Sequence, residues 1–194
     1  MTREILLVPH ANREQNLQAT SRAAELLQDA GITVRVCADE KVLPGLKHVP
    51  HTEDAASGCE LVLVLGGDGT FLRAADMARS VDIPVLGINL GHVGFLAEWE
   101  VESLDQALVR VIDKRYRIED RLTIDVTIFD EEGTLLNRSW ALNEASVENQ
   151  NRSGVLDAIL EVDRRPVSSF GCDGVLISTP TGSTAYAFSA GGPV

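Results

Sequence analysis

The sequence predicts an α/β N-terminal domain with a parallel sheet, residues 1–117, followed by a β-rich C-terminal domain, residues 118–194. Three observations lead to this prediction. In the first half, apolar segments with the spacing of strands and of helices alternate. One of these segments is apolar on both faces, which is typical of a parallel strand covered by helices on both sides. After about Arg117 the helical spacing nearly disappears, and two-residue alternation replaces it.

The first half begins with a short strand and an amphipathic helix. Residues 5–8 form an apolar run, and Asn12 with Gln15 three positions later has the spacing of a capping box. Behind this pair, apolar residues recur every three or four positions as far as Ala30. Gly31 then has the position at which helices commonly end in a left-handed residue. We therefore expect a helix that ends at about Ala30.

The rest of the first half continues the alternation of strand and helix. Strands are expected over residues 32–36, 61–65 and 85–88, and helices over residues 71–81 and 104–112. Residues 61–65 contain only leucine and valine and form the segment that is apolar on both faces. Residues 41–58 contain prolines and histidines, so we expect a mostly irregular surface loop there.

The second half has the pattern of antiparallel strands. Residues 122–129 alternate apolar and polar side chains, and an extended run follows the Glu-Glu-Gly sequence of residues 131–133. We expect a hairpin turn at this glycine. Alternation returns over residues 156–162, which completes the prediction of a β-rich domain.

Composition and charge exclude several classes of function. With 17 Lys and Arg against 29 Asp and Glu, the net charge is −12, so no broad positive surface is available for nucleic acid or an anionic membrane. A phosphate ligand must therefore be held locally. The longest aliphatic run is far shorter than the roughly 20 residues of a membrane span, and the first residues lack the pattern of a signal peptide. We expect a cytoplasmic protein. The cysteines and histidines lack metal-ligand spacing, so no structural metal site is expected.

The sharpest chemical feature is the sequence Gly-Gly-Asp-Gly-Thr at residues 66–70, between a buried strand and a helix. Glycines free the backbone to take positive φ and to bring N–H groups close to a ligand, and a helix N-terminus attracts negative charge. Asp68 is unexpected beside phosphate unless it binds an accompanying Mg²⁺ or accepts a proton from an attacking hydroxyl. The segment favours a phosphoryl-transfer site. The alternative is a tight turn in which Asp68 is the helix N-cap.

Two further motifs contain ligand-binding residue types. Residues 173–186, DGVLISTPTGSTAY, place a cluster of hydroxyl side chains behind an apolar strand. Short hydroxyls suit ribose and phosphate oxygens, and Tyr186 offers an aromatic face to an adenine or nicotinamide ring. The alternative is a Ser/Thr-rich turn at a strand end. The pair Asn143-Glu144 suits a ribose diol, although such pairs are also common in solvated turns and caps. Neither a P-loop nor a Rossmann fingerprint occurs in the sequence.

Together these motifs resemble the ATP-dependent NAD kinases of the inorganic polyphosphate/ATP-NAD kinase family, which phosphorylate the 2′-hydroxyl of the adenosine ribose of NAD to make NADP. Residues 66–70 resemble the glycine-rich acidic motif of that family, Asn143-Glu144 its Asn-Glu pair, and residues 173–192 its long second signature. The first motif also occurs in diacylglycerol and sphingosine kinases and in phosphofructokinases. The other two favour NAD over lipid or sugar phosphate. The resemblance implies an NAD kinase/diacylglycerol kinase-like fold with an all-β, sandwich-like second domain.

The resemblance also implies a role for each candidate residue. Asp68 is expected to be the base, or the group that orients the hydroxyl, at the point where the 2′-hydroxyl loses its proton. The expected phosphate contacts are Gly66, Gly67, Gly69, Thr70 and Arg73, with Arg152 as a further one, and the expected NAD contacts are Asn143, Glu144, Asp173, Thr184, Ala185, Tyr186 and Ser189. The implied partners are NAD and ATP, with inorganic polyphosphate as an alternative donor. Mg²⁺ or another divalent cation is expected to neutralise the triphosphate charge.

The sequence departs from the family at its C-terminal end. It stops at Gly191-Gly192-Pro193-Val194, inside a signature that family members continue past. The resemblance therefore implies a fragment whose β-rich domain is incomplete, cut from a protein that forms dimers or tetramers. Gly171 stands where the family often has a polar or basic residue, so no ligand contact is expected from it. The alternatives to an NAD kinase are an inactive nucleotide-binding fragment and a lipid or sugar kinase.

Overall fold

A computed structural model describes residues 2–10, 14–37, 45–90, 96–97, 99–100, 103–149 and 154–194. The chain divides into two compact units, Met1–Ile118 and Glu119–Val194, called unit 1 and unit 2 below. The sequence placed a domain boundary after residue 117, one residue before this division. In the described part of the chain, no helix combines the length and apolar character that crossing a bilayer requires.

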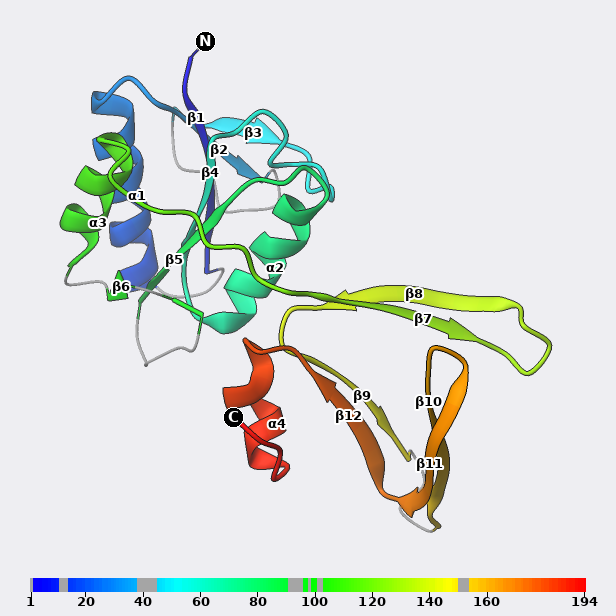
Figure 1. Ribbon diagram of the computed structural model, residues 1–194. Helices are drawn as coiled ribbons and strands as arrows, with labels where there is room; N and C mark the ends of the chain where they lie inside the picture. The colour runs from blue at the N-terminus through cyan, green and yellow to red at the C-terminus, as the bar shows by residue number, and fades with distance from the viewer. Residues whose placement is uncertain are drawn as a thin grey trace. The chain divides into compact units, whose positions relative to one another are not determined.

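Unit 1 is built on a parallel sheet. Its strands are β1 (Glu4–Pro9), β2 (Thr33–Cys37), β3 (Lys47–Val49), β4 (Leu61–Leu65), β5 (Val85–Asn89) and β6 (Trp99–Glu100). Each strand pairs in parallel with its neighbours, in the order β3-β2-β1-β4-β5-β6 (Figure 1). The chain thus adds β2 and β3 on one side of β1, and then β4, β5 and β6 on the other side of β1. The predicted α/β domain with a parallel sheet is confirmed.

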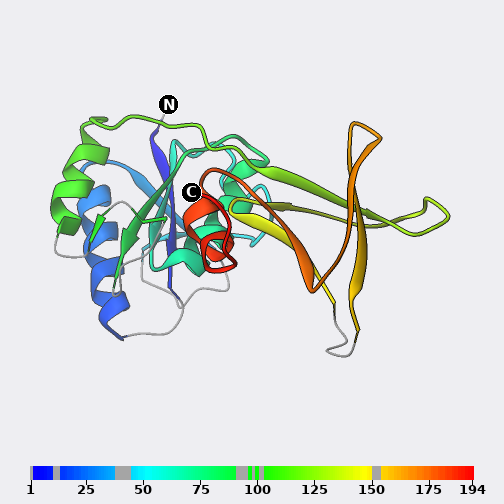
Figure 2. The same ribbon diagram turned by 60° about the horizontal axis from the view of Figure 1, so that its bottom comes forward.

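Helices cover both faces of this sheet (Figures 1 and 2). Helices α1 (Glu14–Asp29) and α3 (Leu104–Ile112) pack on the face that holds Ile5 and Leu63. Helix α2 (Asp68–Arg79) packs on the opposite face, against Leu6 and Val62. Each such side chain stabilises the fold by about 1.5–3 kcal/mol when it is fully buried. Residues 61–65 are therefore buried on both faces, as the sequence predicts.

The ends of the elements in unit 1 follow the sequence signals with two differences. Gly31 has the expected positive φ of 76°, and the Ile32 N–H donates to the Leu27 carbonyl to close the end of α1. Strand β3 lies inside the segment predicted to be an irregular loop, because a three-residue edge strand leaves no alternation to detect. Helix α2 begins at Asp68 rather than near residue 71, because Gly69 and Thr70 hide the helical signal. Asn12, the expected cap, lies outside the described residues.

A partly buried ionic contact joins the start of the sheet to the end of α3. The Arg3 guanidinium donates from Nε and Nη2 to the Glu60 carboxylate, at 2.8 and 2.6 Å, and from Nη1 and Nη2 to the carbonyl oxygens of Ile112 and Val111, at 2.7 and 3.0 Å. The hydrogen bond from Arg3 holds the pKa of Glu60 below its ordinary value, despite the opposing effect of burial. The last carbonyls of α3 thereby gain a cationic partner, which stabilises a helix C-terminus.

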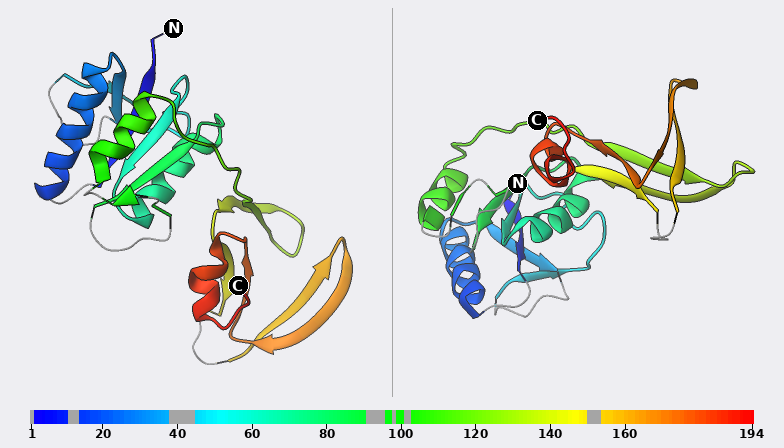
Figure 3. Two further views of the ribbon diagram at one scale, coloured as in Figure 1. Left: turned by 60° about the vertical axis from the view of Figure 1, so that its left-hand side comes forward. Right: turned by 90° about the horizontal axis from the view of Figure 1, so that it is seen from below.

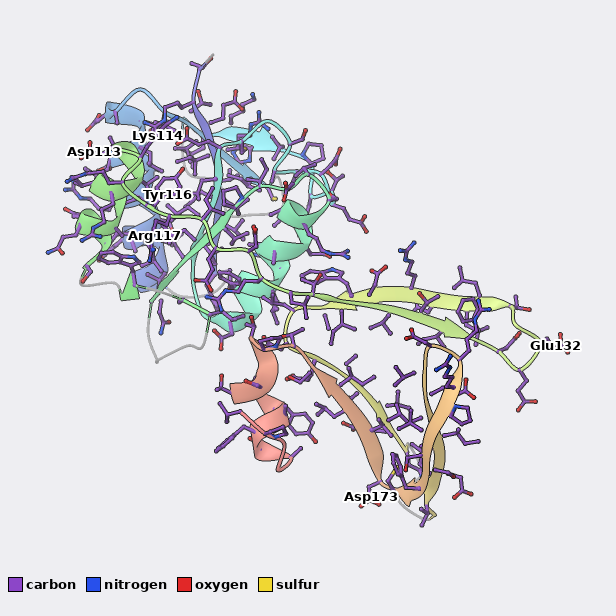
Figure 4. All side chains as sticks on the ribbon, in the orientation of Figure 1. Asp113, Lys114, Tyr116, Arg117, Glu132 and Asp173 are labelled. Atoms are coloured by element: carbon purple, nitrogen blue, oxygen red, sulfur yellow. The ribbon has the colours of Figure 1, made fainter. Side chains whose placement is uncertain are left out.

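Unit 2 consists mainly of antiparallel hairpins (Figure 3). Its elements are β7 (Ile124–Phe129), β8 (Leu135–Ala141), β9 (Glu144–Glu148), β10 (Leu156–Val162), β11 (Arg165–Cys172), β12 (Gly174–Ser178), a short 3₁₀ helix η2 (Gly182–Thr184) and α4 (Tyr186–Ser189). The predicted hairpin turn is confirmed: Gly133 has φ 81°, and Asp130 Oδ1 accepts hydrogen bonds from the N–H groups of Glu132 and Thr134. Figure 4 shows Glu132 at the tip of this hairpin.

The strands of unit 2 pair only two by two in the described residues: β7 with β8, β9 with β12, and β10 with β11. The β-rich character predicted for this half is confirmed. The sandwich-like packing that the resemblance implies is not confirmed, because many large apolar side chains on these strands are exposed, including Ile159 and Leu136. Only Leu142 and Ala187 count as buried apolar residues in the described part of unit 2.

Candidate functional site

The glycine-rich sequence of residues 66–70 lies at the point where the strand order of the sheet reverses. It follows the carboxyl end of β4, next to the carboxyl end of β1, and the Gly66 and His10 N–H groups continue the ladder by donating to Ile88 and Leu65 carbonyls. Open parallel sheets bind ligands outside the carboxyl ends of their strands at such a reversal. The turn also leads directly into α2, whose first N–H groups have no partner within the helix. This edge of unit 1 is therefore suited to an anion.

The three glycines of this turn serve different purposes. A Cβ at Gly66 would lie only 2.7 Å from Thr70 Oγ1 and 3.1 Å from His10 Cβ, so packing excludes a side chain there. At Gly67 and Gly69, no atom of the described residues lies within 4 Å of such a Cβ. None of the three takes positive φ. The expectation that these glycines are needed for positive φ is therefore wrong for this turn. Gly67 and Gly69 instead leave the backbone open to close approach by a ligand.

Asp68 is the first residue of α2, and its carboxylate is held by a second segment. Gly67 has the N-cap position, which rules out the alternative that Asp68 is the cap. Asp68 Oδ1 accepts a hydrogen bond from the Leu96 N–H at 3.0 Å. This contact orients the carboxyl group from a segment that follows β5. No sequence signal could have revealed it, because a backbone N–H is present in almost every residue.

Thr70 and Arg73 are engaged with the protein around the turn. Thr70 is buried and packs against Gly66. Arg73 Nη2 donates to the Pro9 carbonyl at 3.0 Å, which ties α2 to the carboxyl end of β1. Both residues thus lie at the strand reversal, as a phosphate site requires. Arg152 lies outside the described residues.

In unit 2, two motifs that are distant in the sequence meet at the β9–β12 pair. Glu144, at the start of β9, lies opposite Ser178, at the end of β12. The Asn143-Glu144 pair is therefore next to the Ser/Thr-rich turn. Asn143 Oδ1 and Glu144 Oε2 are buried, and no donor among the described residues reaches either oxygen. Buried acceptors without a partner are costly, and hydroxyl donors of a ribose would satisfy both of these atoms.

The hydroxyl groups behind β12 mainly bind backbone. Thr179 Oγ1 lies 2.6 Å from the Leu142 carbonyl oxygen, Ser178 Oγ lies 3.3 Å from that of Asn143, and Ser183 Oγ lies 2.9 Å from that of Pro180. These three hydroxyls fit the alternative interpretation of the motif, a Ser/Thr-rich turn. Their partners show that the turn supports the Asn143-Glu144 pair.

A pocket of about 480 Å³ lies within unit 2. It is lined by Ser146, Glu148, Asn149, Gly154, Asp173, Gly174, Val175, Leu176, Tyr186 and Ala190. Asp173 and Tyr186 are the two sequence-based candidates among them; Figure 4 shows Asp173 at the corner between β11 and β12. Thr184 and Ser189 are exposed at the ends of η2 and α4, and Ala185 lies between these helices.

The sequence reasoning missed Asn149 as a residue of this pocket. Its backbone N–H donates to the Asp173 carbonyl at 3.1 Å, and its side-chain Nδ2 donates to the Gly154 carbonyl at 3.2 Å. It thus braces two walls of the pocket. Its position five residues after Glu144 was the only available signal. The sequence alone does not show that the end of β9 lies next to Asp173.

The described residues contain no cluster of three or more His, Cys, Asp or Glu side chains that could hold a metal ion. Mg²⁺ commonly binds through one or two carboxylates together with substrate phosphates and water. Asp68, in the glycine-rich turn, is a carboxylate of that kind. The donor set therefore fits a cation that binds together with a triphosphate.

A parallel sheet with an open glycine turn at its strand reversal, followed by a β-rich unit, defines a class of α/β proteins suited to anionic ligands. Within this class, the chain belongs to the ATP-NAD kinase family. Residues 5–116 match the ATP-NAD kinase N-terminal domain, and residues 142–194 match the ATP-NAD kinase C-terminal domain.

Relatives and solved structures agree with this assignment. The chain is 66% identical to an NAD kinase of Corynebacterium efficiens over 99% of its length, and 70% identical to one of Corynebacterium glutamicum over 89%. It spans 63% and 62% of these relatives, respectively. An Archaeoglobus fulgidus NAD kinase solved in complex with ATP is 25% identical, with a TM-score of 0.65 over the whole chain and 67% of that protein. A yeast NADH kinase solved with NADH has a TM-score of 0.85 at 22% identity, covering 99% of this chain and 62% of that one, and shows the same fold.

Proposed function

We propose that the protein transfers the γ-phosphoryl group of ATP to the 2′-hydroxyl of the adenosine ribose of NAD, giving NADP and ADP. The observation that carries the proposal is the open turn at Gly67 and Gly69, with the Asp68 carboxylate between them at the strand reversal. A turn that only connects a strand to a helix has no need of two glycines with open space beside them. Phosphate oxygens close to the backbone give those glycines a purpose.

Asp68 is proposed to act on the acceptor hydroxyl. The ribose oxygen attacks the γ-phosphorus, the bond to the bridging oxygen of ADP breaks, and the hydroxyl proton passes to the Asp68 carboxylate. The Leu96 N–H fixes one oxygen of that carboxylate, which limits its motion. Phosphoryl transfer depends mainly on such positioning and on charge stabilisation. Bound with the triphosphate, Mg²⁺ would neutralise part of its negative charge; Arg73 and Thr70 are the proposed side-chain contacts on the phosphate side.

The residues of unit 2 are proposed to bind NAD. The buried acceptors of Asn143 and Glu144 match the donor hydroxyls of a ribose. The pocket lined by Asp173 and Tyr186 offers a carboxylate and an aromatic face to the rest of the dinucleotide. Thr184, Ala185 and Ser189 remain proposed contacts beside it, and Arg152 remains a proposed phosphate contact.

The direct test is NADP formation from NAD, ATP and Mg²⁺, read by an enzymatic cycling assay, with Asp68→Asn as the matched control. Asparagine keeps an oxygen that can accept the Leu96 N–H but cannot act as the base. We expect turnover to fall by roughly 10²–10⁴-fold, while NAD affinity measured by calorimetry stays within about twofold. Near-normal turnover in this variant would remove Asp68 from the base role.

The same assay separates the other candidates. Diacylglycerol and fructose 6-phosphate replace NAD in parallel tubes, and inorganic polyphosphate replaces ATP. Product from NAD alone would support the proposal. No NADP from this chain, nor from a polypeptide extended to the full length of its relatives, would overturn it in favour of a binding module. Cytoplasmic location and assembly into a dimer or tetramer stay predictions, which cell fractionation and light scattering of the full-length protein test.

A further inference from the structure

We propose that Thr179 is a positioning residue, whose buried hydroxyl holds the backbone of residues 142–144 in the orientation that presents the Asn143 and Glu144 side chains to NAD. The inference rests on the proposed function, because it takes the pair to bind the dinucleotide. Thr179 acts through the backbone of the pair and does not touch the ligand itself.

The Thr179 hydroxyl ties three backbone positions together. Only 2% of the residue is exposed. Its Oγ1 lies 2.6 Å from the Leu142 carbonyl oxygen and 3.1 Å from that of Asn143, and it accepts a hydrogen bond from the Gly182 N–H at 3.0 Å. Loss of this hydroxyl would leave buried backbone groups without these partners. Such groups are unfavourable, so the local backbone would rearrange.

The Asn143 carbonyl is the centre of the arrangement. It accepts a hydrogen bond from the Thr179 N–H at 2.8 Å. It also shares two hydroxyl protons with other carbonyls: Thr179 Oγ1 lies 3.1 Å from it and 2.6 Å from the Leu142 carbonyl oxygen, and Ser178 Oγ lies 3.3 Å from it and 3.0 Å from the Thr179 carbonyl oxygen. This carbonyl belongs to the rigid peptide plane that joins Asn143 to Glu144. Fixing its oxygen therefore fixes the backbone dihedral angles on both sides of the plane, and with them the directions in which both side chains leave the backbone.

Gly182 allows the turn to approach this peptide closely. A Cβ at position 182 would lie 2.0 Å from the Asn143 carbonyl oxygen, which no side chain can do. The glycine and the Thr179 hydroxyl thus act together: one removes the obstacle, and the other supplies the hydrogen bonds.

The consequence concerns the two acceptors in the pair. Asn143 Oδ1 and Glu144 Oε2 are buried and have no donor among the described residues, so hydrogen bonds at these atoms do not fix their directions. Their placement depends on the backbone, and the backbone is held by the turn at Thr179. Preorganised acceptors of this kind favour a ligand with hydroxyl donors in matching positions.

The test compares Thr179→Val, which has nearly the same shape but no hydroxyl, with Thr179→Ser, which keeps it. Titration calorimetry measures the Kd of NAD and, separately, of a non-hydrolysable ATP analogue with Mg²⁺. Ser183→Ala is the matched control, since it removes a hydroxyl from the same turn that binds the Pro180 carbonyl and not Asn143. Thermal unfolding of each variant is recorded alongside.

We expect Thr179→Val to raise the Kd of NAD about tenfold, which corresponds to about 1.4 kcal/mol, and to leave that of the ATP analogue within about twofold. Thr179→Ser should restore NAD affinity, and Ser183→Ala should leave it unchanged. If Thr179→Val does not fold, Thr179→Ala takes its place: it removes the same hydroxyl without placing a second methyl group against the two carbonyls, and it should also raise the Kd of NAD about tenfold.

Two results would overturn the proposal, and they differ from a failure of the proposed function. NAD binding by Thr179→Val, or by Thr179→Ala in its place, equal to that of the unchanged chain would show that the hydroxyl does not position the pair. Equal losses for NAD and the ATP analogue would show a general structural role. No NAD binding by the unchanged chain and by the full-length polypeptide would instead reject the proposed function, and the positioning role with it.

Discussion

Unit 1 and unit 2 differ most in where their apolar residues lie. In the described chain, all buried apolar residues except Leu142 and Ala187 belong to unit 1, on the two faces of its sheet. In unit 2, Ile159 and Leu136 are 70% and 64% exposed. The glycine-rich turn of unit 1 is therefore supported by packed strands, whereas the Asn143-Glu144 pair of unit 2 is supported by hydrogen bonds from the turn at Thr179.

The two candidate parts of the site are therefore held in place in different ways. In unit 1 the turn is held in place by the elements at its two ends, since it connects the buried strand β4 to helix α2. In unit 2 the hairpins contribute little packing. The Thr-Pro-Thr-Gly turn, residues 179–182, fixes the Asn143-Glu144 pair by its contacts with the Asn143 carbonyl. Four predictions test the contrast, starting from the largest expected effect.

Leu63→Ala should destabilise the chain by about 2–5 kcal/mol, because Leu63 is fully buried in the middle of the sheet and its loss leaves a cavity. Urea unfolding followed by the helical circular dichroism signal measures this change, since the long helices belong to unit 1. A loss of less than about 1 kcal/mol would show that the packing of unit 1 is loose at this position.

Glu144→Gln should weaken NAD binding by about 1.5–3 kcal/mol, because a hydrogen bond to a charged acceptor is lost. Calorimetric titration with NAD measures the change. Glu161→Gln serves as the comparison: it removes a charge from an exposed position on β10, outside both the pocket and the orphaned pair, and should leave NAD affinity unchanged. Unchanged affinity in Glu144→Gln would exclude Glu144 from the ribose contact.

Glu60→Gln should lower the unfolding free energy by about 1–3 kcal/mol at pH 7, because Arg3 loses its charged partner. The pKa of Glu60 is lowered in the folded chain, so its stabilising effect is complete above its ordinary value of 4.5 and is lost as pH falls through the folded value. The difference between variant and unchanged chain should therefore shrink in acid. Urea unfolding at pH 7 and at pH 3 measures it, and a difference independent of pH would contradict the account.

Ile159→Ala should change the unfolding free energy by less than about 0.5 kcal/mol, because its side chain is exposed on a two-stranded hairpin. The helical signal used for Leu63→Ala does not report on this unit, so tryptophan fluorescence from Trp140 on β8 is the better probe, with Trp99→Phe removing the signal of unit 1. A loss above about 2 kcal/mol would mean that this face is buried in solution.

The elements with strong periodicity could be predicted from the sequence. The strand at residues 61–65 could be predicted because all five of its residues are apolar and buried. The end of α1 could be predicted because Gly31 readily takes the positive φ that it has there. Strand β3 could not be predicted, because its three residues depend on pairing with β2. The sequence also could not show that the glycines of the turn provide space rather than positive φ, since both uses select the same residue.

The candidate site shows the same limit. The sequence identified Asp68 and the Asn143-Glu144 pair by residue type, but not the Leu96 N–H that orients Asp68. It favoured ligand contacts for the hydroxyls behind β12 and kept a Ser/Thr-rich turn as the alternative; the Thr179 hydroxyl lies against the backbone of residues 142 and 143, as in that alternative. Contacts between distant segments depend on strand register, and register becomes visible only in the folded chain.

The most direct test of the central claim is a crossed titration of two variants, Gly67→Ala and Glu144→Gln, each with NAD and with a non-hydrolysable ATP analogue plus Mg²⁺. The claim is that the open turn of unit 1 holds the triphosphate and the orphaned acceptors of unit 2 hold the ribose of NAD. We predict that Gly67→Ala raises the Kd of the ATP analogue about tenfold and leaves the Kd of NAD within about twofold. Glu144→Gln should raise the Kd of NAD about tenfold and leave that of the ATP analogue within about twofold. This division of roles would be contradicted if both variants lost affinity for the same ligand, or if neither variant lost affinity for either ligand.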